Sequence, residues 1–186
     1  MPRIKTQPED WLRVGIRLFS NGGEEAVNIE KMARMLKCSK GSFYWRFKTR
    51  TEFLSRLLER WREISTEEFI ARAEEGGTPG ESLKRLLLEI MRARGARDFD
   101  FYLRRLSFRN KKAARVLGEI EERRLGYMKA LMKKSGMEER EAGEKSDVLY
   151  HYYLGWYERN KKRSPEEGAI LDQIHILGEL LHLPLD

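Results

Sequence analysis

Cysteine, β-branched residues and long apolar runs are scarce in this chain, and each shortage excludes a class of protein. One cysteine among 186 residues cannot form an internal disulfide or a cysteine-based zinc cluster. Valine, isoleucine and threonine together number only 19, so the composition favours helix over sheet. No apolar run approaches the roughly 20 residues that cross a membrane, and the N-terminus lacks the apolar segment of a signal peptide. We therefore expect a soluble, cytoplasmic, all-α protein.

Acidic residues are missing from one basic stretch near the N-terminus. Residues 31–50 contain seven Lys or Arg and no Asp or Glu, in a chain of net charge +7. Such a stretch is typical of a surface that binds a polyanion, although a run of charge can also be an ordinary solvated face. The aromatic residues interleaved with these cations favour the polyanion-binding interpretation.

Proline is also sparse, and its five positions divide the chain into helical intervals. Thr78-Pro79-Gly80-Glu81 and Ser164-Pro165-Glu166-Glu167 both predict capping boxes with proline at the first helical position. Together with the apolar periodicity, these signals predict about nine helices. In the C-terminal part we expect them near residues 79–94, 98–108, 110–135, 139–162 and 165–182.

Four helices are predicted in the first 75 residues. The first places Leu12, Gly15, Ile16 and Phe19 on one face and ends at Asn21-Gly22-Gly23. The second is capped by Asn28 and breaks at Lys37-Cys38-Ser39. The predicted ranges are 9–20, a short helix after Asn28, about 40–46, and one long helix from Thr51 to Glu75. Two short helices joined by a three-residue turn are typical of a helix-turn-helix, so we divide the chain into a DNA-binding domain (residues 1–50) and a helical body (residues 51–186).

The helix near residues 40–46 has the side chains that a major groove requires. A recognition helix needs donors for base edges, while flanking cations and hydroxyl groups grip phosphates. The candidates for base edges are Lys40, Ser42, Trp45 and Arg46. Gly41 stands where a helix would favour alanine by roughly 1 kcal/mol. Its presence indicates either close approach of another backbone or simple tolerance in the first turn.

The string VNIEKMARMLKCSKGSFYWRFKTRTEFL resembles the TetR family of bacterial transcriptional regulators. In that resemblance residues 39–47 correspond to the recognition helix, and Arg50 occupies the position of a phosphate-binding lysine. Lys37 stands where the family's turn usually has glycine, and Arg46 where histidine is common. The resemblance and the residue chemistry together give a predicted DNA-binding set: Asn28, Ser39, Lys40, Gly41, Ser42, Tyr44, Trp45, Arg46, Lys48 and Arg50.

For the helical body, the resemblance implies a homodimer that binds a small-molecule effector and represses transcription at a palindromic operator. Apolar stripes on the last two helices predict the dimer interface, with ordinary monomer core as the alternative. The interface set is Leu149, Tyr152, Tyr153, Trp156, Ile170, Ile174, Leu177 and Leu181. The predicted effector pocket draws on Trp61, Phe69, Phe99, Phe101, Tyr102, Phe108 and Tyr127. The arginines Arg104, Arg105, Arg109, Arg123 and Arg124 could favour an acidic ligand.

Two other classes of function compete with this interpretation. An enzyme is disfavoured because we find no nucleophile elbow, phosphate loop or paired catalytic carboxylates, and no cofactor motif. The three histidines, His151, His175 and His182, lack a Cys or Asp partner in the sequence that would predict a metal site. A helical DNA-binding or protein-interaction module without an effector remains the alternative. An enclosed cavity in the helical body would favour the ligand-responsive regulator.

Overall fold

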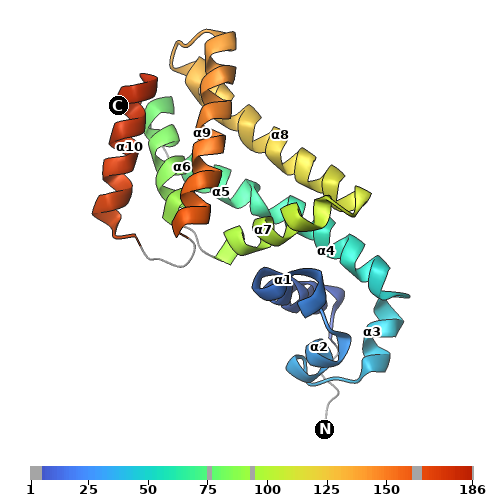
Figure 1. The fold of residues 1–186 in the computed structure, drawn as a ribbon. Helices are drawn as coiled ribbons and strands as arrows, with labels where there is room; N and C mark the ends of the chain where they lie inside the picture. Colours follow the sequence, from blue (N-terminus) through green and yellow to red (C-terminus); the bar gives the residue numbers. More distant parts are fainter. Residues whose placement is uncertain (1–5, 75–76, 93–94, 161–164, 186) are drawn as a thin grey trace. The chain divides into compact units, whose positions relative to one another are not determined.

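The computed structural model describes residues 6–74, 77–92, 95–160 and 165–185, with only the backbone given for Glu68, Phe69 and residues 95–97. Over these residues the chain forms ten helices and no strand, which confirms the predicted all-α class (Figure 1). The helices are α1 (Pro8–Ala26), α2 (Ile29–Met35), α3 (Lys40–Arg46), α4 (Arg50–Ser65), α5 (Glu67–Ala73), α6 (Pro79–Arg92), α7 (Gly95–Ser107), α8 (Lys111–Lys134), α9 (Glu139–Asn160) and α10 (Glu167–Leu181).

The helices gather into two compact units that do not divide at residue 50. The first unit contains Met1–Ile64 and Gly95–Glu119, and the second contains Ser65–Arg94 and Ile120–Asp186. Thus α4, α7 and the start of α8 belong with the helix-turn-helix rather than with the C-terminal helices.

The N-terminal helices begin and end close to the predicted positions. The Gln7 backbone N–H donates to the Asp10 carboxylate at 2.9 Å and stabilises the first turn of α1. Helical dihedrals stop at Gly22 and Gly23, where φ of Gly23 is 67°, although hydrogen-bonded turns continue to Ala26. A Cβ on Gly23 would lie 2.8 Å from the Tyr102 ring, so both the backbone conformation and the packing require glycine there.

Aromatic side chains form the core of the first unit. Phe43 of α3 lies 5.3 Å from Trp11 and 5.2 Å from both Phe47 and Phe53, measured between ring centroids, and all four side chains are fully buried. Gly15 allows α1 to approach α4, because a Cβ there would lie 2.7 Å from Phe53. This core fixes the orientation of α3 and turns its remaining faces outward.

A second aromatic cluster joins α4 and α7 to α1. The Phe99 ring stacks on Trp61 with centroids 4.2 Å apart and lies 4.2 Å from Phe19. The Trp61 indole N–H donates to the buried Asp100 carboxylate at 2.8 Å. Because Trp61 and Phe99 fill this core, neither lines the cavity described below, contrary to the expectation from the sequence.

The predicted long helix from Thr51 to Glu75 is wrong, because the chain breaks it at Thr66 into α4 and α5. The Arg124 guanidinium donates to the Thr66 hydroxyl at 3.2 Å and to the Ser65 carbonyl at 3.5 Å. The Ser65 carbonyl is a group that an uninterrupted helix would use for its own next turn. The break therefore depends on a residue 58 positions away in the sequence.

The C-terminal unit contains α5, α6, α9, α10 and the second part of α8. The Thr78 capping box is confirmed, since the Thr78 N–H donates to Glu81 at 2.6 Å and the Glu81 N–H donates back to the Thr78 hydroxyl at 3.1 Å. The second predicted box is wrong in its register. Ser164 lies outside the described residues, and α10 begins only at Glu167, after Pro165. Figure 1 shows α10 alongside α6, and the contacts between these two helices agree.

Within the described residues, none of the helices combines the length and apolar character needed to cross a membrane. The same part of the chain contains no group of three or more His, Cys, Asp or Glu placed to hold a metal ion.

Candidate nucleic-acid interface

Helices α2 and α3 are joined by a turn whose backbone is that of a helix-turn-helix. The Asn28 side chain accepts from the Lys31 N–H at 2.9 Å, which confirms it as the cap of α2. Lys37 adopts φ 51°, a left-handed conformation that most residues avoid. The turn thus keeps the geometry that glycine usually provides, with lysine in its place.

The outer face of α3 is strongly exposed and carries two aromatic side chains. Trp45 is 75% exposed and Tyr44 is 55% exposed. Tryptophan side chains in proteins are on average largely buried. The Arg46 guanidinium lies 4.5 Å from the centre of the Trp45 ring, so a cation covers part of that surface. Gly41 is also exposed, and a Cβ there would meet only the Ser39 hydroxyl, at 3.6 Å.

Several predicted DNA contacts already have partners within the chain. Lys40 forms an ion pair with Glu30 of α2, and this hydrogen bond lowers the pKa of the Glu30 carboxyl. Ser42 bonds the Thr6 hydroxyl at 2.9 Å, and Arg46 donates to the Thr6 carbonyl at 3.1 Å. These side chains therefore link α3 to α2 and to the segment before α1, in addition to any role at DNA.

Arg50 has a different set of partners from the phosphate expected in the sequence analysis. Its guanidinium donates to the carbonyls of Glu24 and Val27 and pairs with the Glu24 carboxylate at 3.3 Å. These contacts fasten the start of α4 to the end of α1. In this structure Arg50 is a positioning residue for the helix-turn-helix.

The remaining predicted contacts are accessible. Ser39 begins α3 without accepting a side-chain cap bond, and Lys48 follows the helix with its side chain exposed. Exposed cations of α2 and of the turn after it extend the same basic surface and were part of the charge signal in the sequence: Lys31, Arg34 and Lys37. The arrangement offers an aromatic and basic helix face with a glycine at its edge.

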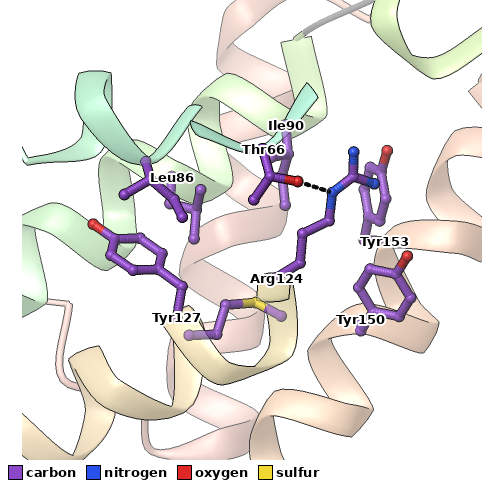
Figure 2. Close-up of a pocket in the computed structure, with 9 residues that line it drawn as sticks. Thr66, Leu86, Ile90, Arg124, Tyr127, Tyr150 and Tyr153 are labelled. Carbon is purple, nitrogen blue, oxygen red and sulfur yellow. Dashed lines mark hydrogen bonds between the residues drawn. The ribbon is translucent and has the colours of Figure 1, made fainter. Parts of the chain in front are cut away.

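The second unit contains a cavity between α5, α6, α8 and α9 (Figure 2). Its volume is about 40 Å³, and it is partly open to solvent. Figure 2 shows the Arg124 side chain running between Tyr127 on one side and Tyr150 and Tyr153 on the other. The lining residues are Thr66, Ile70, Leu86, Ile90, Arg124, Tyr127, Met128, Tyr150 and Tyr153.

Among the predicted pocket residues whose side chains the structure describes, Tyr127 alone lines this cavity. Its hydroxyl is buried without a hydrogen-bond partner in the described part of the chain. Burial, together with the nearby Glu74 carboxylate, raises the pKa of Tyr127 to about 12. Phe108 is 87% exposed, Phe101 and Tyr102 lie on α7 in the first unit, and the Phe69 side chain lies outside the described residues. Of the five arginines that suggested an acidic ligand, Arg124 is in the cavity wall.

The predicted dimer stripes lie mostly inside a single copy of the chain. The following members are buried: Leu149, Tyr153, Ile170, Ile174 and Leu177. Tyr152, Trp156 and Leu181 are half-buried. Monomer core, the alternative that the stripes left open, therefore describes the buried members. The large apolar side chains that α9 and α10 expose are instead Val148, Leu171, Ile176 and Leu180.

Comparison with known proteins identifies the N-terminal segment. Residues 12–57 match the family described as "Bacterial regulatory proteins, tetR family". The N-terminal segment is therefore similar to the DNA-binding segment of that family. The matched segment spans α2, α3, most of α1 and the first half of α4, so it contains the helix-turn-helix described above. The search among curated proteins found no match to this chain.

Solved structures show that the similarity in fold extends beyond the matched segment. A transcriptional regulator of Saccharomonospora viridis, crystallised with choline, is 17% identical, with a TM-score of 0.79 over 92% of this chain and 95% of its own. A regulator of the TerR/AcrR family from Aquifex aeolicus is 20% identical, with a TM-score of 0.69 over 94% and 98%. A fatty acid metabolism regulator of Clostridium perfringens is 16% identical, with a TM-score of 0.69 over 93% and 97%. At these identities the likeness shows a common fold.

Proposed function

We propose that this chain represses transcription as a homodimer that binds a palindromic operator through α3 and releases it when a small molecule occupies the cavity of the second unit. The observation that carries the DNA-binding part is the outer face of α3. The tryptophan and tyrosine of this basic helix remain largely exposed, and such side chains suit base edges and phosphates in a major groove.

The proposal assigns roles to residues of α3 and to residues beside it. Gly41 permits close approach of the DNA backbone, Tyr44 and Trp45 contact bases or phosphates, and Lys48 contacts a phosphate. Lys40 exchanges its partner Glu30 for DNA, because an exposed ion pair costs little to break. Asn28 and Ser39 lie at the N-termini of α2 and α3. Arg50 holds the start of α4 against the end of α1.

Dimerisation is supported by the apolar side chains that α9 and α10 leave exposed. Leu180 is 73% exposed, Val148 48% and Ile176 45%. Apolar side chains on neighbouring surface helices are typical of a protein interface. A two-fold dimer places two copies of α3 on half-sites about 34 to 36 Å apart, or a multiple of that distance. Val148→Glu combined with Leu180→Glu should convert the dimer into monomers in analytical ultracentrifugation.

The effector site is supported by the cavity and its lining. Apolar and aromatic side chains make up most of the lining, with a few polar groups among them, which is typical of small-molecule sites. The Saccharomonospora viridis regulator binds choline, a cation. In the present cavity the charged lining residue is Arg124, itself a cation, so we expect a neutral or acidic molecule with an apolar body.

A DNA-binding protein without an effector is the second candidate, and it shares every feature of the first unit. It differs in that the cavity would have no ligand that changes DNA affinity.

For the ligand-responsive repressor, the proposed mechanism is a two-state equilibrium in which ligand selects the dimer whose recognition helices no longer match the half-site spacing.

The decisive experiment begins with selection of binding sites from a pool of random duplex DNA. The expected product is a near-palindromic sequence bound by two copies of the chain. Small carboxylic acids with apolar bodies are then screened for release of that DNA, beside choline as the cationic comparison. Binding without sequence preference would contradict the operator. Specific binding that no compound changes would leave the regulator without an effector and favour the second candidate.

A further inference from the structure

Arg124 has two places in the second unit, because it lines the cavity and also bonds to the break between α4 and α5. Its Nε–H donates to the Thr66 hydroxyl at 3.2 Å, and its Nη2–H donates to the Ser65 carbonyl at 3.5 Å. Thr66 is itself a lining residue, and Figure 2 shows its bond to Arg124 at the cavity wall. A ligand in the cavity would therefore lie next to the side chain that stabilises the break.

The two bonds at the break can be replaced by a ligand of the right chemistry. Both acceptors are neutral, and the distances lie at or beyond the usual upper limit of about 3.2 Å. A carboxylate has the opposite charge to a guanidinium and accepts two parallel bonds from it, at about 2.7–2.9 Å. The Nε–H and Nη2–H groups form one edge of the Arg124 guanidinium, so a single carboxylate can accept from both.

The backbone at the break is close to that of a continuous helix. Thr66 has ψ −43°, which is the α-helical value, and φ −114°, which is about 50° away from it. The hydrogen bonds of α5 begin at this residue, since the Ile70 N–H donates to the Thr66 carbonyl at 3.0 Å. A change centred on one dihedral angle would therefore join α4 to α5.

Two features of the sequence and the core favour the continuous form. Residues 51–75 contain no glycine and no proline, and their apolar spacing predicts a single helix. The Ser65 hydroxyl is buried without a hydrogen-bond partner in the part of the chain that the structure describes, which disfavours the broken form. The broken and continuous helices are therefore alternative forms of one segment, and Arg124 stabilises the broken one.

We propose that a ligand carboxylate binds the Nε–H and Nη2–H groups of Arg124 in place of Thr66 and Ser65, and that the released junction then closes into one helix. The inference rests on the proposed function and deepens it, because it names the acidic group that the effector carries and the bonds that it replaces. Arg124 binds the ligand directly, whereas Ser65 and Thr66 are positioning residues. Because α4 follows α3 directly in the chain, the exchange links the cavity to the recognition helix.

Binding is tested by calorimetry on the full-length protein with straight-chain carboxylates from acetate to octanoate, each paired with its primary amide. The amide has nearly the same shape but no charge. We expect the carboxylates to bind at least about tenfold more tightly than their amides, and Arg124→Met to abolish the difference. Lys134→Met removes an exposed cation from the same helix and should retain it. Equal binding of the paired compounds, or no binding of either, would overturn the proposal.

The junction is followed by hydrogen exchange at the backbone amides of residues 66–69, which bond to residues 62–65 in a continuous helix. Saturating carboxylate should slow exchange there at least about tenfold relative to amides of α10. Arg124→Met should show the slow exchange without ligand. Unchanged exchange at residues 66–69 under saturating carboxylate would overturn the closing of the junction.

Thr66→Val separates the exchange of partners from a purely structural role. It removes one of the two acceptors that compete with the ligand for Arg124, so carboxylates should bind about threefold more tightly while amide binding stays the same. Weaker carboxylate binding by Thr66→Val would contradict the competition.

Operator affinity is measured separately, so that this inference and the proposed function can fail independently. Carboxylate binding with the junction response supports the inference even where operator affinity stays the same, a result that would contradict the ligand-responsive repressor. Operator release by a compound that leaves exchange at residues 66–69 unchanged would instead support the repressor and overturn the inference.

Discussion

Gly41 and Gly15 allow the same substitution to be made at two helical positions with opposite expected effects. A Cβ at Gly41 meets nothing closer than 3.6 Å, so alanine there should stabilise α3 by up to about 1 kcal/mol. A Cβ at Gly15 would lie 2.7 Å from Phe53 and 2.8 Å from Leu57, both fully buried. Overpacking of this kind costs about 1–3 kcal/mol. The Tm should rise by roughly 2–4 °C for Gly41→Ala and fall for Gly15→Ala.

DNA binding should reverse the order of the two variants. If Gly41 is present because a DNA backbone approaches it, the added methyl group should cost about 1–3 kcal/mol of binding, or roughly 5- to 150-fold in Kd. Gly15→Ala leaves the outer face of α3 unchanged and should bind operator normally at a temperature where it is folded.

The assay combines thermal unfolding with fluorescence anisotropy on the selected operator at fixed salt. A Gly41→Ala protein that is more stable and binds as tightly as the unsubstituted chain would refute the close-approach argument. Gly41 would then be a tolerated first-turn glycine, the alternative that the sequence left open.

Three further predictions concern the body and the second aromatic cluster. Lys129 and Lys133 of α8 lower the pKa of Glu139 from 4.5 to about 2. The stabilisation from these ion pairs is therefore complete above about pH 4.5 and is lost as the pH falls towards 2. In urea titrations, the unsubstituted protein should lose its greater free energy of unfolding relative to Glu139→Gln across that interval. Tyr127→Phe removes a buried hydroxyl group without a partner in the described chain, so its free energy of unfolding should stay equal or rise by up to about 1 kcal/mol in chemical denaturation. Trp61→Phe deprives the buried Asp100 of one donor and should destabilise the protein by about 1–3 kcal/mol in the same assay, whereas an unchanged value would contradict a stabilising role for that bond.

Local signals predicted the helix-turn-helix well. Apolar spacing located the faces of α1 and α2, the Asn28 cap marked the start of α2, and the turn at Lys37 fell where two short helices had to meet. Each of these features depends on residues within a few positions of one another, so a short stretch of sequence is enough to predict it.

Features that depend on distant partners were not predictable in the same way. The break at Thr66 requires Arg124, and the anchor at Thr6 requires two residues of α3. The spacing of apolar residues also predicted which face of a helix is buried, but not which other element that face packs against. Trp61 therefore joined the core of the first unit instead of the cavity, and Ile174 became monomer core instead of an exposed interface.

The most direct test of the central claim is a salt-dependent titration of the selected operator with the unsubstituted protein, Tyr44→Ala and Trp45→Ala. Phe108→Ala is the matched control, because it removes an 87% exposed aromatic side chain from the turn between α7 and α8. We predict a steep salt slope, at least a tenfold loss of affinity for both α3 variants and none for the control. Unchanged binding by both α3 variants would mean that the exposed face of α3 does not contact DNA, and would contradict the account.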